Sequence, residues 1–103
     1  MIYQLRTYTV NRGMMDAWVQ HFNEKLVGLM AKNGITVVGA WVNDDQNQFI
    51  WIRSFPSAEE VKTREAAFYD SQEWKDTVDH TRSHLARLTV ETMESVLKVP
   101  TGR

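Results

Sequence analysis

The sequence predicts one α+β domain with the ferredoxin-like order β-α-β-β-α-β and a four-stranded antiparallel sheet. Stretches rich in aromatic and β-branched residues alternate with stretches of helical periodicity. Hydrophobic residues make up 43% and charged residues 24% of the chain, which is typical of a globular protein. The 103 residues suit a single domain, expected over residues 1–99, with a tail over 100–103.

The first third of the chain predicts a strand followed by a long helix. Ile2–Val10 is rich in aromatic, β-branched and threonine residues and predicts the strand. A helix is expected over residues 14–32, ended by the Asn-Gly pair at 33–34. One face of this helix carries the residues expected against the core, which are Met15, Trp18, Phe22, Lys25, Leu26 and Leu29.

The rest of the chain predicts a hairpin, a broken helix and a last strand. Ile35–Val42 and Gln48–Phe55 are expected as strands joined by an all-polar loop. Ser57-x-x-Glu60 is a capping box that predicts a helix to about Tyr69. Asp70-x-x-Glu73 resembles a second capping box, so the helix is expected to restart there and run to about Arg87. A fourth strand is expected within Thr89–Val99.

The hairpin strands predict a homodimer. Right-handed crossovers place all helices on one face of the sheet, and a sheet with one wet face alternates apolar and polar residues. These strands are instead apolar in both phases. One phase holds Ile35, Val37, Trp41, Phe49, Trp51 and Phe55, and the other holds Val38, Ala40, Val42, Ile50 and Ile52. We therefore expect a second copy to cover the helix-free face.

Composition excludes several classes of partner and chemistry. The formal net charge of −1 favours neither nucleic acid nor an anionic membrane as a partner. The absence of cysteine excludes a disulfide scaffold, a thiolate metal site and a Cys nucleophile. No P-loop, G-x-S-x-G or G-x-G-x-x-G motif occurs, and we expect no cofactor. No signal-peptide pattern precedes Ile2, so a cytoplasmic location is expected.

Arg6 and Arg53 are the most informative charges, because each lies in the middle of a strand expected to be covered on both faces. A buried guanidinium needs a partner. One interpretation is an ion pair, within the chain or across a dimer, for which Glu91 and Glu94 of the fourth strand are available. The other is that these arginines anchor the carboxylate or enolate of a ligand.

A ligand pocket is expected between the first helix and the sheet. Trp51 shares its strand phase with Arg53, so an aromatic wall and a cation are predicted to border one cavity. His21 lies at the edge of the helix's apolar stripe, where it either lines this pocket as an acid or base or merely covers the margin. The predicted ligand-binding residues are thus Arg6, His21, Trp51 and Arg53, with no catalytic residue assigned.

His80 and His84 have the i, i+4 spacing that can place two imidazoles on one metal ion. A helical wheel centred on Val78 turns both, together with Asp76, toward solvent. We therefore expect no intrinsic metal site, because the histidines are not predicted to converge on a buried face.

Motifs along nearly the whole chain resemble the NIPSNAP family. They are Met1-Ile-Tyr-Gln-Leu-Arg-Thr-Tyr-Thr followed by Gly13, then Gly39-x-Trp41, Trp51 with Arg53, Arg64-Glu65-Ala66, and Glu73-Trp74 after Asp70. The resemblance is to the short bacterial type, without a mitochondrial N-terminal extension, and it implies a dimeric α+β barrel. The wider superfamily includes cofactor-independent monooxygenases, haem-degrading enzymes and small isomerases, among which fold kinship does not choose.

Two function classes follow. One is a dimeric binding module for a small apolar or anionic ligand. The other is a cofactor-independent monooxygenase or isomerase acting on a small aromatic or polyketide-like substrate. A pocket holding a titratable group would favour the enzyme, and a filled core would favour a module without chemistry.

Overall fold

A computed structural model describes residues 1–98, so the expected tail at 100–103 lies outside the described residues. The strands are β1 (Ile2–Val10), β2 (Thr36–Val42), β3 (Gln48–Phe55) and β4 (Leu85–Glu94). They form one antiparallel sheet in the order β2-β3-β1-β4. The predicted ferredoxin-like fold is confirmed.

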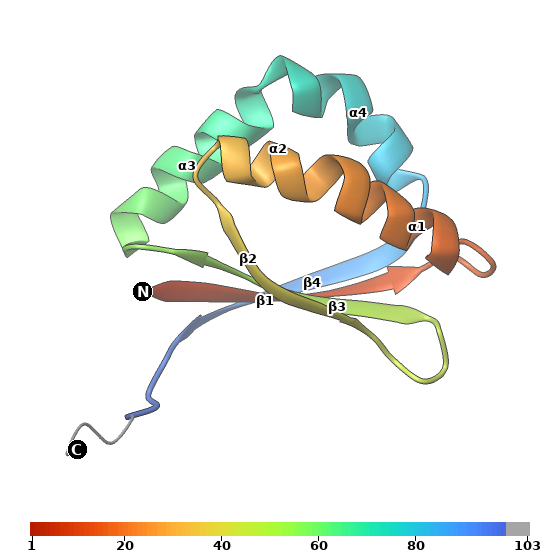
Figure 1. The fold of residues 1–103 in the computed structure, drawn as a ribbon, viewed down its shortest axis with the longest axis horizontal. Coiled ribbons are helices and arrows are strands. Elements are labelled where there is room, and N and C mark those ends of the chain that lie inside the picture. The colour runs from red at the N-terminus through yellow and green to blue at the C-terminus, as the bar shows by residue number, and fades with distance from the viewer. Residues whose placement is uncertain (99–103) are drawn as a thin grey trace.

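The helices occupy the two crossover connections. The first connection is one continuous helical run, made of α1 (Met15–His21), η1 (Phe22–Leu26) and α2 (Val27–Lys32). The second holds α3 (Ala58–Asp70) and α4 (Gln72–Arg82). All of them lie on one face of the sheet, and the other face is uncovered (Figure 1). We call this uncovered face the open face.

The first helical run departs from the predicted regular helix because η1 is a π-helix. A π turn uses i→i+5 hydrogen bonds and is wider than an α turn, so it rotates the residues around it. Met30 thereby becomes buried, whereas Lys25, expected on the buried face, is exposed. The other residues expected on that face are buried, namely Met15, Trp18, Phe22, Leu26 and Leu29.

The helix starts follow side-chain caps, one as predicted and one shifted by a residue. Ser57 accepts a hydrogen bond from the Glu60 amide at 3.2 Å and caps α3. The second cap is Ser71 rather than Asp70, because the extended backbone of Ser71 lets its hydroxyl accept from the Trp74 amide at 3.2 Å.

The observed end of α4 differs from the predicted end by several residues, a larger difference than at the helix starts. The helix ends at Arg82, not near Arg87, and β4 begins at Leu85. The physical reason is the free edge of β1, whose backbone groups need hydrogen-bond partners as far as Val10, which pairs with Leu85. His84 consequently leaves the helix and its exposed face, with consequences described below.

Aromatic side chains dominate the core between the helices and the sheet. Trp18 and Phe55 are fully buried, and the Trp18 ring lies 5.7 Å from the Phe49 ring. Phe22 packs on Phe49 and Trp51 with ring centroids 4.7 and 5.0 Å apart. These rigid contacts hold the first helical run against β1 and β3 and frame the site.

The open face carries an apolar patch, and a β-bulge changes which residues this patch holds. The bulge lies between Val37 and Gly39, so Trp41 pairs with Ile50 on the open face instead of sharing the phase of Val37. The Trp41 ring lies over Gly39, where an added Cβ would stand 2.7 Å from the ring. Trp41 is 54% exposed there. Within residues 1–98, no helix is long and apolar enough to cross a membrane.

Candidate functional site

The two arginines singled out in the sequence lie side by side on the helix-covered face of the sheet. Arg6 in β1 pairs with Trp51 in β3, and two residues further along the ladder Gln4 pairs with Arg53. Paired residues point to the same face, and residues two apart in a strand share a face. The alternation of β1 and β3 therefore sets both guanidiniums under the helices and beside the indole of Trp51.

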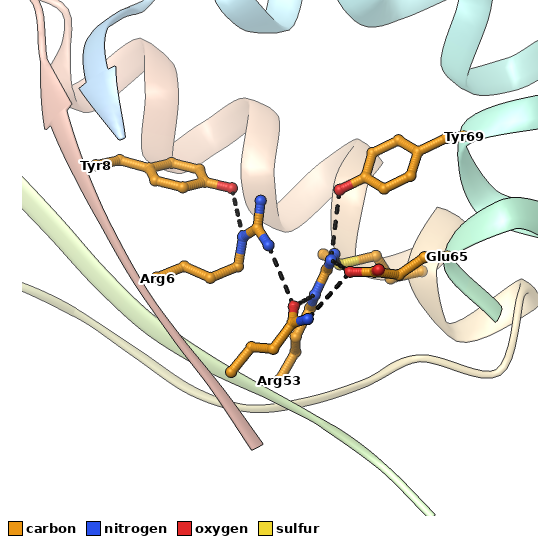
Figure 2. A network of polar contacts seen from close by, with 7 residues as sticks. Arg6, Tyr8, Arg53, Glu65 and Tyr69 are labelled. Atoms are coloured by element: carbon orange, nitrogen blue, oxygen red, sulfur yellow. Dashed lines mark hydrogen bonds and ion pairs between the residues drawn. The ribbon is translucent and has the colours of Figure 1, made fainter. Parts of the chain in front are cut away.

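Arg53 is only 1% exposed and is fully provided with partners. Its Nη2 forms an ion pair with Glu65 Oε2 of α3 at 2.6 Å, and its Nε donates to Gln4 Oε1 at 2.8 Å. The Tyr69 hydroxyl oxygen lies 3.4 Å from the same Nη2 (Figure 2). The ion-pair interpretation therefore holds for Arg53, and its carboxylate comes from α3 and not from Glu91 or Glu94 of the fourth strand.

Arg6 is 8% exposed, and its partners among the described residues are neutral. Its Nε donates to the Tyr8 hydroxyl oxygen at 2.9 Å, and its Nη1 donates to Gln4 Oε1 at 3.2 Å. Its Nη2 has no hydrogen bond to any described residue, and Figure 2 shows this nitrogen pointing away from the network. No carboxylate in residues 1–98 pairs with Arg6, since Glu91 pairs with Leu5, whose phase is opposite to that of Arg6.

Aromatic rings surround both cations. The Arg6 guanidinium carbon lies 5.7 Å from the Tyr8 ring centre and 5.6 Å from that of Trp51. The Arg53 guanidinium carbon lies 5.7 Å from the centre of the same Trp51 ring. Cation–π contacts of this kind contribute about 0.5–2 kcal/mol, so they stabilise the cations without neutralising them.

A cavity of about 90 Å³, the inner cavity, opens above these residues between the helices and the sheet. Three of the four residues predicted to bind a ligand line it, namely Arg6, Trp51 and Arg53. The remaining lining residues are mostly apolar or aromatic: Tyr8, Trp18, Leu26, Met30, Phe68, Tyr69, Trp74, Thr81, Arg82, Leu85 and Leu88. No Asp or Glu among the described residues lines this cavity.

Two buried indole N–H groups in the wall lack acceptors. Nε1 of Trp18 and Nε1 of Trp51 are buried and make no hydrogen bond within the described chain. Leaving a buried donor unpaired costs about 1–3 kcal/mol. Both tryptophans line the inner cavity, but their Nε1 atoms are buried behind its surface, so these two donors do not reach a ligand there.

The inner cavity reaches the surface between the end of α4 and the start of β4. Arg82 and Leu88 line it and are exposed, Leu88 by 46%. Together with Leu85 they form what we call the mouth. These three residues also line an adjoining surface depression of about 320 Å³, the outer hollow, which extends over Ala86 and Arg87. A ligand longer than the inner cavity therefore has room outside the mouth.

His21, the fourth predicted residue, does not line the inner cavity. Its Nε2 lies 2.7 Å from Oγ1 of Thr81, a residue that does line it, so His21 supports the wall from behind. Burial lowers the pKa of His21 below its ordinary 6.5, and the nearby His80, His84 and Lys25 lower it further. His21 is therefore neutral at pH 7.

The three histidines gather in one cluster, and the helical-wheel prediction is wrong for His84 although His80 is exposed as it predicted. The His21 and His80 ring centres are 4.9 Å apart, as are those of His80 and His84, and the His21 and His84 rings stack at 5.7 Å. His84 is only 3% exposed because α4 ends before it and its Nδ1 lies 2.9 Å from the His80 carbonyl oxygen. Even so, no group of three or more His, Cys, Asp or Glu side chains in residues 1–98 has metal-binding geometry.

Sequence reasoning missed Gln4, Tyr8 and Glu65. Gln4 bridges the two arginines through Oε1 and donates from Nε2 to Glu65 at 3.1 Å. The signal for Gln4 and Tyr8 was present, since both share the strand phase of Arg6 and would lie beside it. Glu65 had no such signal, because its place depends on how α3 crosses the sheet.

The chain resembles known proteins both in sequence, through a family model, and in fold, through solved structures. A NIPSNAP family model matches residues 3–102. An uncharacterized NIPSNAP domain protein from Burkholderia xenovorans has a TM-score of 0.88 at 13% identity, covering 97% of this chain and 99% of that chain. A NIPSNAP family protein of unknown function from Agrobacterium tumefaciens has a TM-score of 0.87 at 19% identity, covering 97% of this chain and 92% of that one.

The same fold extends beyond these relatives. The structure of an antibiotic biosynthesis monooxygenase has a TM-score of 0.69 at 15% identity, covering 94% of this chain and all of that chain. No curated protein matches this sequence. At such identities, structural similarity establishes the fold alone. Because the family model spans almost every residue and NIPSNAP proteins share the fold over their full length, this chain belongs to the NIPSNAP family.

Proposed function

We propose that this protein binds a small ligand with an apolar body in the inner cavity. The observation that carries the proposal is the wall itself, in which aromatic side chains surround the Arg6 guanidinium, whose Nη2 has no acceptor in the described chain. A filled core would satisfy or exclude that donor. Ligand sites have the opposite character, with an apolar lining and a few polar groups that orient the ligand.

The dimensions limit the ligand. Ligand pockets commonly enclose about 300–1,000 Å³, and a dry cavity of about 150 Å³ holds benzene. The inner cavity of about 90 Å³ therefore accepts a head group or the edge of one ring. The rest of the ligand is expected in the outer hollow, over the apolar side chains of Leu85 and Leu88.

Tryptophan fluorescence tests this proposal, since Trp18 and Trp51 are in the wall. We expect benzoate, benzamide, 2-naphthoate or 2-naphthamide to change the emission in a saturable way. The matched variants are Leu88→Trp and Leu97→Trp, at two leucines that are 46% and 78% exposed. Only Leu88 lines the mouth. Loss of binding in Leu88→Trp alone supports the proposed site. Equal effects of the two variants, or no saturable response to any compound, would contradict it.

The second candidate function is a cofactor-independent monooxygenase or isomerase. Its specific support is the Arg6 guanidinium beside the Tyr8 hydroxyl in an apolar cavity, an arrangement suited to stabilising an enolate. The fold shared with an antibiotic biosynthesis monooxygenase agrees with this candidate without selecting it. Oxygen uptake, or isomer formation, with a small polyketide-like substrate is expected in the parent protein and not in Arg6→Gln. Binding without turnover would contradict the enzyme candidate and leave ligand binding as the only proposed function.

We also propose that the open face pairs with the open face of a second copy. Val38 and Trp41 are 53% and 54% exposed on it, in a sheet that the helices cover on one side only. Light scattering at micromolar concentration should give twice the 12.0 kDa chain mass. Trp41→Glu should give a folded monomer, whereas Lys62→Glu on α3 should not change the mass. A parent protein that stays monomeric would overturn this assembly.

A further inference from the structure

We propose that the ligand of the inner cavity is a monoanion whose charged oxygens bind Nη2 of Arg6; this inference rests on the proposed small-ligand function. The first argument is the charge balance of the site. Two buried guanidiniums, those of Arg6 and Arg53, stand beside a single carboxylate, that of Glu65. One positive charge is left without a partner among the described residues.

The second argument locates that charge. Glu65 contacts Arg53 directly, and Gln4 donates its amide N–H to the same Glu65 oxygen. Within residues 1–98, Arg6 donates only to the neutral oxygens of Tyr8 and Gln4. Because an unpaired charge inside a protein is costly, an anion is favoured at Arg6 rather than at Arg53.

The third argument is that the free donors adjoin the same space. Nη2 of Arg6 has no partner in residues 1–98, and Arg6 lines the inner cavity. The Tyr8 oxygen already accepts from Arg6, so its own proton remains available to a ligand acceptor. No acidic side chain of the described residues lines the cavity to repel an anion. Exposed Arg82 at the mouth adds a further positive charge on the path inward.

The surroundings define the rest of the ligand. Trp18, Trp51 and Trp74 line the cavity around the arginines, and their rings form flat apolar walls. A carboxylate on an aromatic ring meets both requirements, with oxygens at Arg6 and a ring edge between the indoles. A dianion would overcompensate the single free charge, and a neutral amide would leave it unpaired. We therefore assign the site to aromatic monocarboxylates.

The experiment compares acids with their neutral amides on the parent protein. We expect benzoate and 2-naphthoate to bind about 10–100-fold tighter than benzamide and 2-naphthamide, the scale of one hydrogen bond to a charged group. Arg6→Gln should remove this preference by weakening the binding of the acids to about the level of the amides. Arg12→Gln, at an exposed turn residue, should keep the preference. Near-ultraviolet circular dichroism checks that each variant is folded.

The outcomes separate this inference from the function on which it rests. Equal binding of acids and amides by the parent protein overturns the monoanion and leaves the small-ligand function standing. That comparison needs no variant, so it decides even if Arg6→Gln does not fold. A preference that survives in folded Arg6→Gln overturns the assignment to Arg6. Failure of all four compounds to bind overturns both the inference and the proposed function.

Discussion

Arg6 and Arg53 are the same residue type in nearly the same setting, yet their surroundings give them different roles. Both are buried under the helices, both donate to Gln4 Oε1, and both lie within 5.7 Å of the Trp51 ring centre. Arg53 has a carboxylate from α3, and Arg6 has none among the described residues. The difference shows that burial alone does not identify a binding residue. What distinguishes the two is whether the fold itself supplies the counter-charge.

The largest expected effect is on the Arg53 side of this comparison. Arg53→Met should lower the free energy of unfolding by about 3 kcal/mol, because removing one partner of a buried ion pair leaves the other unpaired. The value lies at the lower end of the range since the Glu65 side chain is 28% exposed and regains some water. Urea unfolding of the ligand-free protein measures the change. A loss below 1 kcal/mol would mean that the ion pair does not support the fold.

Glu65→Gln removes the carboxylate but keeps an acceptor oxygen beside Arg53. We expect the free energy of unfolding to fall by about 2 kcal/mol, the scale of a hydrogen bond to a charged group. Glu59→Gln provides the control, because Glu59 is exposed in the first turn of the same helix. Similar losses in both variants would show that α3 responds to charge in general and not to the pair with Arg53.

His21, which supports the cavity wall through Thr81, should make the stability of the protein depend on pH. Neither arginine can do so, because a guanidinium stays protonated throughout the accessible pH range. The pKa of His21 is lowered in the folded state, so the unfolded chain binds the proton more tightly. Stability should therefore fall as pH drops below about 6.5, where the unfolded histidine takes up its proton. Thermal melts between pH 7.5 and 5.5 test this. His21→Gln should flatten the profile, and an unchanged slope would assign the dependence to other groups.

The smallest expected effect belongs to Arg6. Arg6→Met should change the stability of the ligand-free protein by no more than about 1 kcal/mol, because replacing an uncompensated buried charge with an apolar side chain is often neutral or favourable. Urea unfolding beside Arg53→Met gives a direct comparison. If Arg6→Met were as damaging as Arg53→Met, both arginines would be structural.

Local sequence patterns predicted the fold and part of the site. The strand and helix order, the Ser57 cap and the Asn-Gly helix stop follow from side-chain chemistry within a few residues, and each is present. Strand alternation also predicted that Trp51 and Arg53 share a face, and both line the inner cavity. Short-range rules suffice wherever the deciding partner is near in sequence.

The failures have a common physical cause, which is competition from distant partners. β1 drew residues 85–88 into the sheet, which ended α4 early and buried His84 among the other histidines. The Arg53 partner lies on α3, whose position depends on how the whole helix packs. The π turn and the β-bulge each shifted the phase of the residues that follow, and neither has a simple sequence signature.

Nitrogen-15 NMR of the arginine side chains tests the central claim most directly. Arg6 and Arg53 signals are assigned with the two substitutions above, and the parent protein is titrated with benzoate or benzamide. We predict that benzoate shifts the Arg6 guanidinium signals in a saturable way and leaves the Arg53 signals in place, whereas benzamide moves neither strongly. Shifts confined to Arg53, or saturation by benzoate with Arg6 unmoved, would contradict the assignment of the free charge to Arg6.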